Sequence, residues 1–354
     1  MKSSAKEASM TAMQVERESS AQRIETAAKK RAKRRAAVRR PRASIKLSAR
    51  TRKPTVSIIG VGRLGAALAL ALAKHGYPIE AVVARKPSRA QRIARLIAAP
   101  RPRALSSGQL DQLPPSDLIF ITTPDDAIAD TAAQLAAHTS NRIHKRTALH
   151  MSGALSSDAL RPLRDAGFAI GSMHPLISIN DATSGAENLQ KAFYCVEGGQ
   201  RAIALARKVT RDFGARSFSV GTKHKALYHA AAVMASGHMV ALFDVATEML
   251  AQCGLRGVSA AEVLLPLVRS TVENLAAREP AQALTGTFAR AEVDVVQQHL
   301  AALSAEDDSD SLRDARALYI LLGRRSLRLA ENNGASAGAL TEIMRALEET
   351  SRHR

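Results

Sequence analysis

The sequence has few aromatic residues and few cysteines, and it lacks a long uninterrupted apolar run. Aromatic residues make up 3% of the 354 residues and tryptophan is absent, so we expect a core of aliphatic side chains. Cys195 and Cys253 lie far apart and match no zinc-ligand spacing, which predicts neither a disulfide framework nor a metal site. The apolar stretches at 66–73 and 230–242 are short or interrupted, so we expect no membrane-spanning segment. These absences favour a reducing, cytoplasmic location.

Positive charge is abundant but concentrated at the N-terminus. The net charge is +19, and residues 1–53 carry 17 Lys and Arg against 4 Glu. This basic arm has almost no bulky apolar residue, so we predict that it is disordered. It is either a solvated extension or a site of weak contact with nucleic acid or acidic partners.

The rest of the chain predicts two domains of different classes. From Pro54, short β-rich runs alternate with helical segments, which indicates βαβ units and a mainly parallel sheet over residues 54–221. After about Gly221 the strand-like runs stop and apolar residues recur at helical spacing. We therefore predict an α/β domain of the Rossmann type followed by an all-helical domain at residues 222–350.

A glycine-rich turn begins the predicted α/β domain. Gly60, Gly62 and Gly65 follow an apolar strand in a G-x-G-x-x-G pattern, and Arg63 and Leu64 open an Ala/Leu-rich helix. The first glycine permits a tight turn, the second lets a diphosphate approach the backbone, and the third lets helix and strand pack closely. A structural glycine turn is the alternative, but the strand before it and the helix after it favour dinucleotide binding.

The second predicted strand, IEAVVAR, ends in cations where NAD-binding sites usually have an acidic residue. Arg85 and Ser88 at this place would attract the 2′-phosphate of NADP, so we expect NADP(H) to be preferred over NAD(H). A pair of ordinary surface cations, Arg85 and Lys86, is the alternative.

The fourth predicted strand runs into Thr123 and Pro124, which should border the cofactor at the carboxyl end of the sheet. Asp125 and Asp126 follow them. For at least one of these two carboxylates we expect capping of the next helix.

Three further segments, LHMSGALSSDAL at 149–160, GSMHPLISI at 171–179 and KALYHAAAVMASGHMVALFDVA at 225–246, complete a family resemblance. Together with the glycine turn they resemble the Rossmann-like proteins that carry a C-terminal domain of unknown function, the DUF2520 type. That family is related to pyrroline-5-carboxylate reductase, 3-hydroxyisobutyrate dehydrogenase and 6-phosphogluconate dehydrogenase. The resemblance covers residues 55–345 and implies a C-terminal domain like that of 6-phosphogluconate dehydrogenase, with a homodimer formed through the helical domains.

The chain departs from this family's pattern in its helical half. Gly237 stands where the family usually has Asn, and Thr287, Ala291 and Glu292 replace the usual Pro, Gly and Asp. These changes leave the predicted fold intact but bear on the chemistry of the substrate pocket.

The resemblance also points to the residues that would carry chemistry. Related dehydrogenases place a Lys, and four residues later an Asn, beside the nicotinamide; here Lys225 is followed by His229. At about 100° per residue, Lys225, His229 and Ser236 fall on one helical face, so we predict Lys225 and His229 as catalytic and Ser236 as substrate-binding. A packed histidine and a surface lysine are the structural alternatives.

Residues that follow two apolar strands are expected to line the opposite wall of this site. We predict Ser152, Gly153 and His174 as substrate-binding residues, while His150 and His238 fit structural roles better. The favoured function is NADP-dependent oxidoreduction of a small carbonyl, imine or hydroxy compound, with a deazaflavin as a variant substrate that some relatives use. A non-catalytic NADP-binding sensor and a nucleic-acid-associated protein remain as alternatives.

Overall fold

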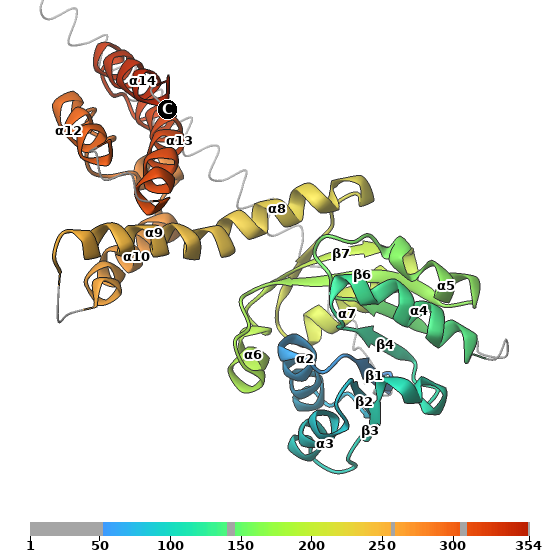
Figure 1. The fold of residues 1–354 in the computed structure, drawn as a ribbon. Helices are drawn as coiled ribbons and strands as arrows, with labels where there is room; N and C mark the ends of the chain where they lie inside the picture. The colour runs from blue at the N-terminus through green and yellow to red at the C-terminus, as the bar shows by residue number, and fades with distance from the viewer. Residues whose placement is uncertain (1–51, 140–145, 256–258, 305–309, 353–354) are drawn as a thin grey trace, which may run out of the picture. The chain divides into compact units, whose positions relative to one another are not determined.

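The computed structural model describes residues 52–139, 146–255, 259–304 and 310–352 (Figure 1). Residues Pro54–Arg354 form one unit by their mutual contacts. Nearly all of the basic arm lies outside the described residues, so its disorder stays a prediction, as does the domain boundary near residue 221.

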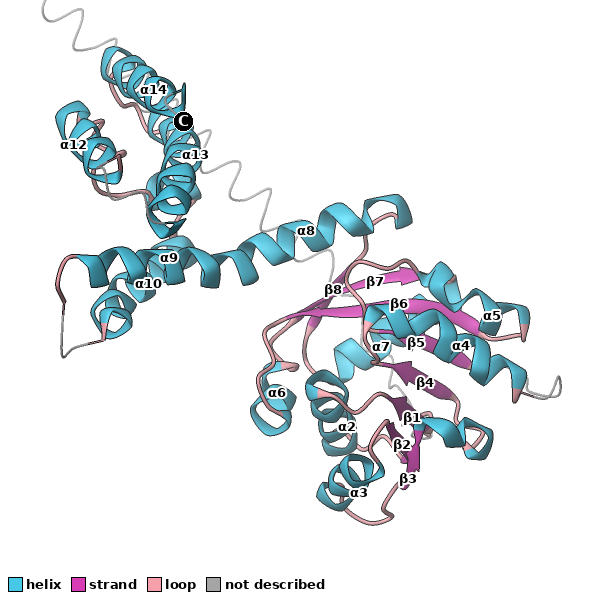
Figure 2. Cartoon of the chain, in the orientation of Figure 1, coloured by secondary structure: helices cyan, strands magenta, loops and turns pink. Residues whose placement is uncertain are grey.

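An eight-stranded sheet forms the first half, in the order β3-β2-β1-β4-β5-β6-β7-β8 (Figure 2). Strands β1 to β6 run parallel to one another. Strand β7 runs antiparallel to β6, and β8 is parallel to β7. The mainly parallel sheet is thus confirmed. The strands are β1 (Val56–Ile59), β2 (Ile79–Ala84), β3 (Arg103–Ser106), β4 (Leu118–Ile121), β5 (Thr147–His150), β6 (Ala169–Leu176), β7 (Phe193–Gly198) and β8 (Arg216–Phe218).

Helices cover both faces of this sheet, which explains why β1 and β4 are buried along their whole length and why β4 is a continuous apolar run. One face shares a hydrophobic cluster with α2 (Arg63–Lys74), α3 (Pro87–Leu96), α6 (Ala182–Asn188) and α7 (Gln200–Asp212). The other packs against α4 (Ile128–Ala137), α5 (Arg161–Asp165) and the short 3-10 segments η1 (Ser107–Gln112) and η3 (Ser157–Leu160).

The strand order creates a switch point between β1 and β4. From β1 the chain moves outward to β2 and β3, then returns to the other side of β1 with β4. The crossover connections therefore diverge at this place, and open parallel sheets bind ligands at the carboxyl ends of such strands. The glycine turn after β1 and the Thr122–Pro124 loop after β4 both lie at this edge.

Helices alone follow β8 in the part of the chain that the structure describes, as predicted. They are η4 (Thr222–His224), α8 (Lys225–Ala235), α9 (Gly237–Gln252), α10 (Ala260–Ala277), α11 (Pro280–Ala283), α12 (Val293–Leu303), α13 (Asp310–Asn332) and α14 (Ala337–Arg352). The last three share a small apolar core that includes Val296, Ile343 and Leu347.

The helical register that we used for Ser236 is wrong. Helix α8 ends at Ala235, and Ser236 has φ −126° and ψ −76°, outside the helical range. Gly237 then begins α9. Glycine and serine are weak helix formers, so this Ser-Gly pair is a natural place for a break.

Candidate functional site

The glycine turn after β1 has the geometry that its sequence predicts at two of its three glycines. Gly60 has φ +102°, a conformation that L side chains rarely adopt, and a Cβ there would lie 2.7 Å from the amide nitrogen of Thr123. At Gly65 a Cβ would collide with the carbonyl oxygen of Gly60 and the hydroxyl of Thr122. These two glycines permit the turn and the close packing of α2.

Gly62 differs, because a Cβ added there would meet no atom within 4 Å. The open space at Gly62 lies directly before the N-terminus of α2, where Arg63 and Leu64 begin the helix and no side chain caps it. Uncapped amide groups at a helix start carry partial positive charge and bind phosphate groups well. The protein therefore has an open cradle where the sequence predicted a diphosphate.

The hydroxyl group of Thr122 links the glycine turn to the loop after β4. Thr122 Oγ1 donates to the carbonyl oxygen of Gly60 over 2.7 Å, which ties the loop after β4 to the loop after β1. The next residue, Thr123, has a buried hydroxyl without a hydrogen-bond partner among the described residues. Unpartnered buried hydroxyls are rare in proteins, and this one fits a loop that a ligand completes.

The two residues predicted to bind the 2′-phosphate lie just before α3 and in its first turn. Arg85 and Ser88 are both exposed there. The sequence reasoning missed Arg89, whose Nε donates to the carbonyl oxygen of Val61 over 2.7 Å and so fixes its guanidinium against the glycine turn. The signal was present, because Arg89 directly follows Ser88 in the same short stretch.

Asp125 has a different role from the one we expected. Neither Asp125 nor Asp126 caps α4, which begins at Ile128 without a side-chain cap. The carboxylate of Asp125 instead accepts a hydrogen bond of 2.7 Å from Ser152 Oγ. This contact joins the loop that borders the glycine turn to the loop after β5.

Ser152 builds that second loop rather than offering a free hydroxyl. Its Oγ donates to Asp125 and also accepts hydrogen bonds from the amides of Ala154, at 3.1 Å, and Leu155, at 3.0 Å. Beside it, a Cβ at Gly153 would collide with His229 Nδ1 and lie 2.8 Å from His174 Cε1. Only glycine lets the two histidines approach the backbone this closely.

Lys225 is almost fully buried, with 1% of its surface exposed. Its Nζ donates to the carbonyl oxygen of Ser152 over 3.3 Å and to Ser172 Oγ over 3.2 Å. Burial lowers the pKa of this amine, because a charged ammonium loses its hydration. The surface-lysine alternative is thus excluded.

The two histidines lie edge to face beside Gly153, with ring centroids 5.6 Å apart. His174 Nδ1 is 2.6 Å from the hydroxyl of Tyr228, and burial, aided by the charge of Lys225, lowers the pKa of His174 to about 4. His174 is therefore neutral at pH 7. His229 Nδ1 is buried and has no hydrogen-bond partner among the described residues.

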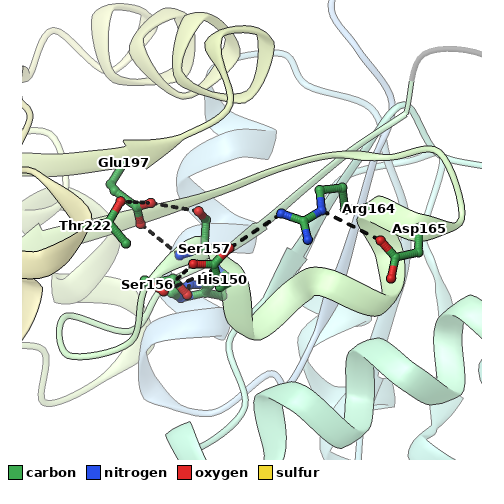
Figure 3. Close-up of polar contacts among 8 residues, drawn as sticks. His150, Ser156, Ser157, Arg164, Asp165, Glu197 and Thr222 are labelled. Atoms are coloured by element: carbon green, nitrogen blue, oxygen red, sulfur yellow. Dashed lines mark hydrogen bonds and ion pairs between the residues drawn. The ribbon is translucent and has the colours of Figure 1, made fainter.

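Of the remaining candidates, His150 borders this cluster, whereas Ser236 and His238 lie at the break between α8 and α9. His150 is fully buried, accepts a hydrogen bond from the amide of Ser152 at Nδ1 and lies 3.0 Å from the carbonyl oxygen of Ser156 at Nε2, so its role is structural (Figure 3). Burial lowers the pKa of His150 to about 4. Ser236 and His238 are exposed at the α8–α9 break, and Ser236 lies at the opposite end of α8 from Lys225.

The arrangement joins an open cradle for phosphate groups to a buried amine and a histidine with an unused nitrogen. The connection runs from the glycine turn through Asp125 and Ser152 to Lys225. In the described ranges, no group of three or more His, Cys, Asp or Glu side chains could hold a metal ion. The groups present are suited to proton transfer beside a bound dinucleotide.

Comparison with known proteins places both halves in families. Residues 38–175 match the Rossmann-like domain, and residues 192–326 match the domain of unknown function DUF2520. No curated protein matches the sequence of this chain.

Solved structures share the fold at low sequence identity. Protein TM1727 from Thermotoga maritima has 21% identity and a TM-score of 0.61, covering 79% of this chain and 99% of its own. Protein BF3122 from Bacteroides fragilis, described as a candidate NADP oxidoreductase, has 21% identity and a TM-score of 0.61 over 78% of this chain and 99% of its own. A reductive aminase from Aspergillus terreus, in complex with NADPH and ethyl levulinate, has 16% identity and a TM-score of 0.51 over 85% and 94%.

Proposed function

Because this chain belongs to the Rossmann-like proteins that carry a C-terminal DUF2520 domain, we propose that it is an NADP(H)-dependent oxidoreductase acting on a small carbonyl, imine or hydroxy compound. One observation carries the proposal: the open cradle at Gly62 is joined through Asp125 and Ser152 to the buried amine of Lys225. The NADPH complex of a protein with the same fold supports it.

The residues at the carboxyl edge of the sheet fit this cofactor. The amides of Arg63 and Leu64 would bind the diphosphate at the start of α2, and Gly62 leaves the room for it. Arg85 and Arg89 would hold the 2′-phosphate, since guanidinium groups pair well with phosphate oxygens. When bound, NADPH supplies the hydride.

Lys225 and His229 would exchange the proton that accompanies hydride transfer. Burial lowers the pKa of the Lys225 amine, so its ammonium form gives up a proton more readily than that of an exposed lysine, which suits a general acid. His229 Nδ1 is buried beside Gly153 and has no hydrogen-bond partner among the described residues, so a substrate oxygen or nitrogen placed against it would supply the missing partner. His174, neutral and held by Tyr228, would shape the wall of the site.

The cofactor preference is tested by melting-temperature shifts with NADPH and NADH. We expect NADPH to bind at least about tenfold more tightly, or about 1.4 kcal/mol. Arg85→Asp should remove this preference because it puts a negative charge against the 2′-phosphate. Arg103→Asp, at an exposed position at the amino end of β3, is the control and should leave the ratio unchanged. Equal binding of both nucleotides by the wild-type protein would refute the preference.

An unpartnered apolar surface on the helical half supports a homodimer. No residue of α9 or α10 is buried, although α9 is rich in Val, Leu and Met and α10 is rich in Leu and Val. This apolar helix surface is formed by Leu227, Met234, Met239, Val240, Leu242, Val263, Leu265, Leu267, Val272 and Leu275, all at least 40% exposed. Patches of this kind mark protein or membrane contacts.

A second copy of the chain is the occupant we propose. The basic arm has almost no bulky apolar residue with which to cover the surface. By length and composition Thr222–Gln252 could also cross a membrane. However, Lys225 within this stretch is buried and donates hydrogen bonds to Ser152 and Ser172, and the helix is interrupted at Ser236. Both features favour a protein partner over a membrane.

Val240→Asp is expected to convert the dimer into a monomer, because it would bury a charge in the interface. Light scattering after gel filtration should give about twice 37.8 kDa for the wild-type protein and 37.8 kDa for the variant. Leu96→Asp, at an exposed apolar residue of α3, is the matched control and should stay dimeric. A monomeric wild-type protein, or one that sediments with lipid vesicles, would contradict the dimer.

We further propose a reducing, cytoplasmic location and a small molecule as the main partner. The sequence has only two cysteines, Cys195 and Cys253, and a low cysteine content is typical of proteins in reducing compartments. Contact with nucleic acid is proposed only as a weak property of the basic arm.

A further inference from the structure

A buried carboxylate that the sequence reasoning did not consider lies next to this site. Glu197 on β7 is 5% exposed and accepts four hydrogen bonds. Figure 3 shows its contacts with Ser157 and Thr222. Its Oε1 accepts from Ser157 Oγ at 2.7 Å and from Thr222 Oγ1 at 3.2 Å. Its Oε2 accepts from the amide of Ser157 at 2.8 Å and from Ser172 Oγ at 3.3 Å. The four donors use the hydrogen-bonding capacity of both carboxylate oxygens.

The antiparallel pairing of β6 and β7 produces this arrangement. Ser172 and Glu197 are direct register partners across the two strands, so their side chains lie on the same face of the sheet. The strand before Glu197 is apolar and buried, from Tyr194 to Val196. A carboxylate in such a strand is costly unless hydrogen bonds and a nearby cation compensate it.

The compensating cation is reached through one hydroxyl group. Ser172 Oγ accepts a hydrogen bond from Lys225 Nζ and donates one to Glu197, so it bridges the ammonium and the carboxylate. A second link runs through Thr222, which precedes Lys225 by three residues at the start of the helical half. Glu197 thus contacts both the partner of the amine and the segment that carries it.

We propose that Glu197 is a positioning residue that, through Ser172, holds the ammonium group of Lys225 in place and keeps it charged within a buried site. Its contact with Thr222 fixes the segment from which α8 begins. This proposal rests on the proposed function in one respect, the use of Lys225 as a proton donor. The bridge through Ser172 between Lys225 and Glu197 does not depend on that function.

Other titratable groups also face Lys225 and must be weighed against Glu197. They are Cys195 of β7, Asp125 of η2 (Asp125–Ala127), His150 of β5, His174 of β6 and Tyr228 of α8. Both histidines are neutral at pH 7, and burial raises the pKa of the Cys195 thiol. Glu197 is the one carboxylate in this set that a single hydroxyl links to the amine, and its charge raises the pKa of Lys225 against the effect of burial.

The test measures the titration of Lys225 in the full-length protein without cofactor or substrate. Lysine amines are labelled with trace acetic anhydride over a series of pH values, and mass spectrometry reads the extent at Lys225. The midpoint of the pH dependence is the readout, so slow access to a buried amine does not affect it. The exposed Lys223 serves as the internal reference.

Glu197→Gln should lower the labelling midpoint of Lys225 by at least about one pH unit, or about tenfold in proton affinity. The glutamine can keep its oxygen toward the Ser157 amide and turn its NH2 group toward the hydroxyls of Ser157 and Thr222, so folding should be retained. Ser172→Ala removes the bridge and should shift the midpoint in the same direction. Glu187→Gln, at an exposed position on α6, is the matched control and should leave it unchanged.

Thr222→Val distinguishes the effect of Glu197 on the Lys225 ammonium group from its effect on the stability of the segment before α8. It removes the link to α8 but keeps the carboxylate, so it should lower the melting temperature without moving the midpoint. An unchanged midpoint in both Glu197→Gln and Ser172→Ala would overturn the proposal. Because the labelling needs no nucleotide, this failure would leave NADPH binding untouched, and a failure to bind NADPH would leave the labelling result valid.

Discussion

Gly62→Val is expected to weaken NADPH binding by at least about 100-fold, or about 2.7 kcal/mol, while the protein keeps its fold. The structure has no atom within 4 Å of a Cβ at this position, and the backbone there is extended, which valine accepts. The valine methyl groups would instead fill the space that the diphosphate needs. Isothermal titration with NADPH measures the loss, and the melting temperature of the free protein reports that folding is retained.

Gly65→Val is the matched control, since it places the same side chain three residues later. Its Cβ would collide with the Gly60 carbonyl and the Thr122 hydroxyl, so it should destabilise the free protein by about 1–3 kcal/mol. One glycine is thus expected to be needed for binding and the other for folding. Wild-type NADPH affinity in Gly62→Val would show that the diphosphate does not lie at this turn.

Lys225→Met is expected to reduce NADPH oxidation by about 10²- to 10⁴-fold, because it removes the group that exchanges the proton. Methionine fills a similar volume but leaves the buried Glu197 carboxylate without its compensating cation, so the melting temperature should fall, and turnover is measured at a temperature where the variant is folded. NADPH affinity should change little, since the proposed function assigns Lys225 to the substrate and not to the dinucleotide. The measurement is NADPH absorbance across a panel of small carbonyl, imine and hydroxy compounds, after a substrate for the wild-type protein is found.

Lys223→Met, at the exposed neighbouring lysine, is the control and should keep wild-type turnover. Retained turnover in Lys225→Met would remove this lysine from the chemistry. Tight NADPH binding by the wild-type protein without oxidation of any compound in the panel would favour the sensor alternative.

The features predictable from sequence are those set by local pattern. The alternation of β-rich runs with helical segments after Pro54 predicted the mainly parallel sheet, and the helical spacing of apolar residues after Gly221 predicted the helical second half. The turn and packing requirements of Gly60 and Gly65 followed from their spacing alone, because a strand, a tight turn and a helix leave few conformations for those positions.

The missed features depend on residues that are distant in sequence. Glu197 reads as an ordinary charged residue at a strand end, and only the register of β6 with β7 places it opposite Ser172. Asp125 reads as a helix cap until β4 and β5 lie side by side and bring Ser152 to it. Ser236 was placed by extending a helix through a Ser-Gly pair, where the structure breaks it.

A crystal structure with bound NADP⁺ is the most direct test of the cofactor site. It should show diphosphate oxygens within about 3.2 Å of the amide nitrogens at the start of α2, next to Gly62, and the 2′-phosphate against Arg85 and Arg89. A dinucleotide bound elsewhere, or a turn that stays empty at saturating NADP⁺, would contradict the proposed oxidoreductase.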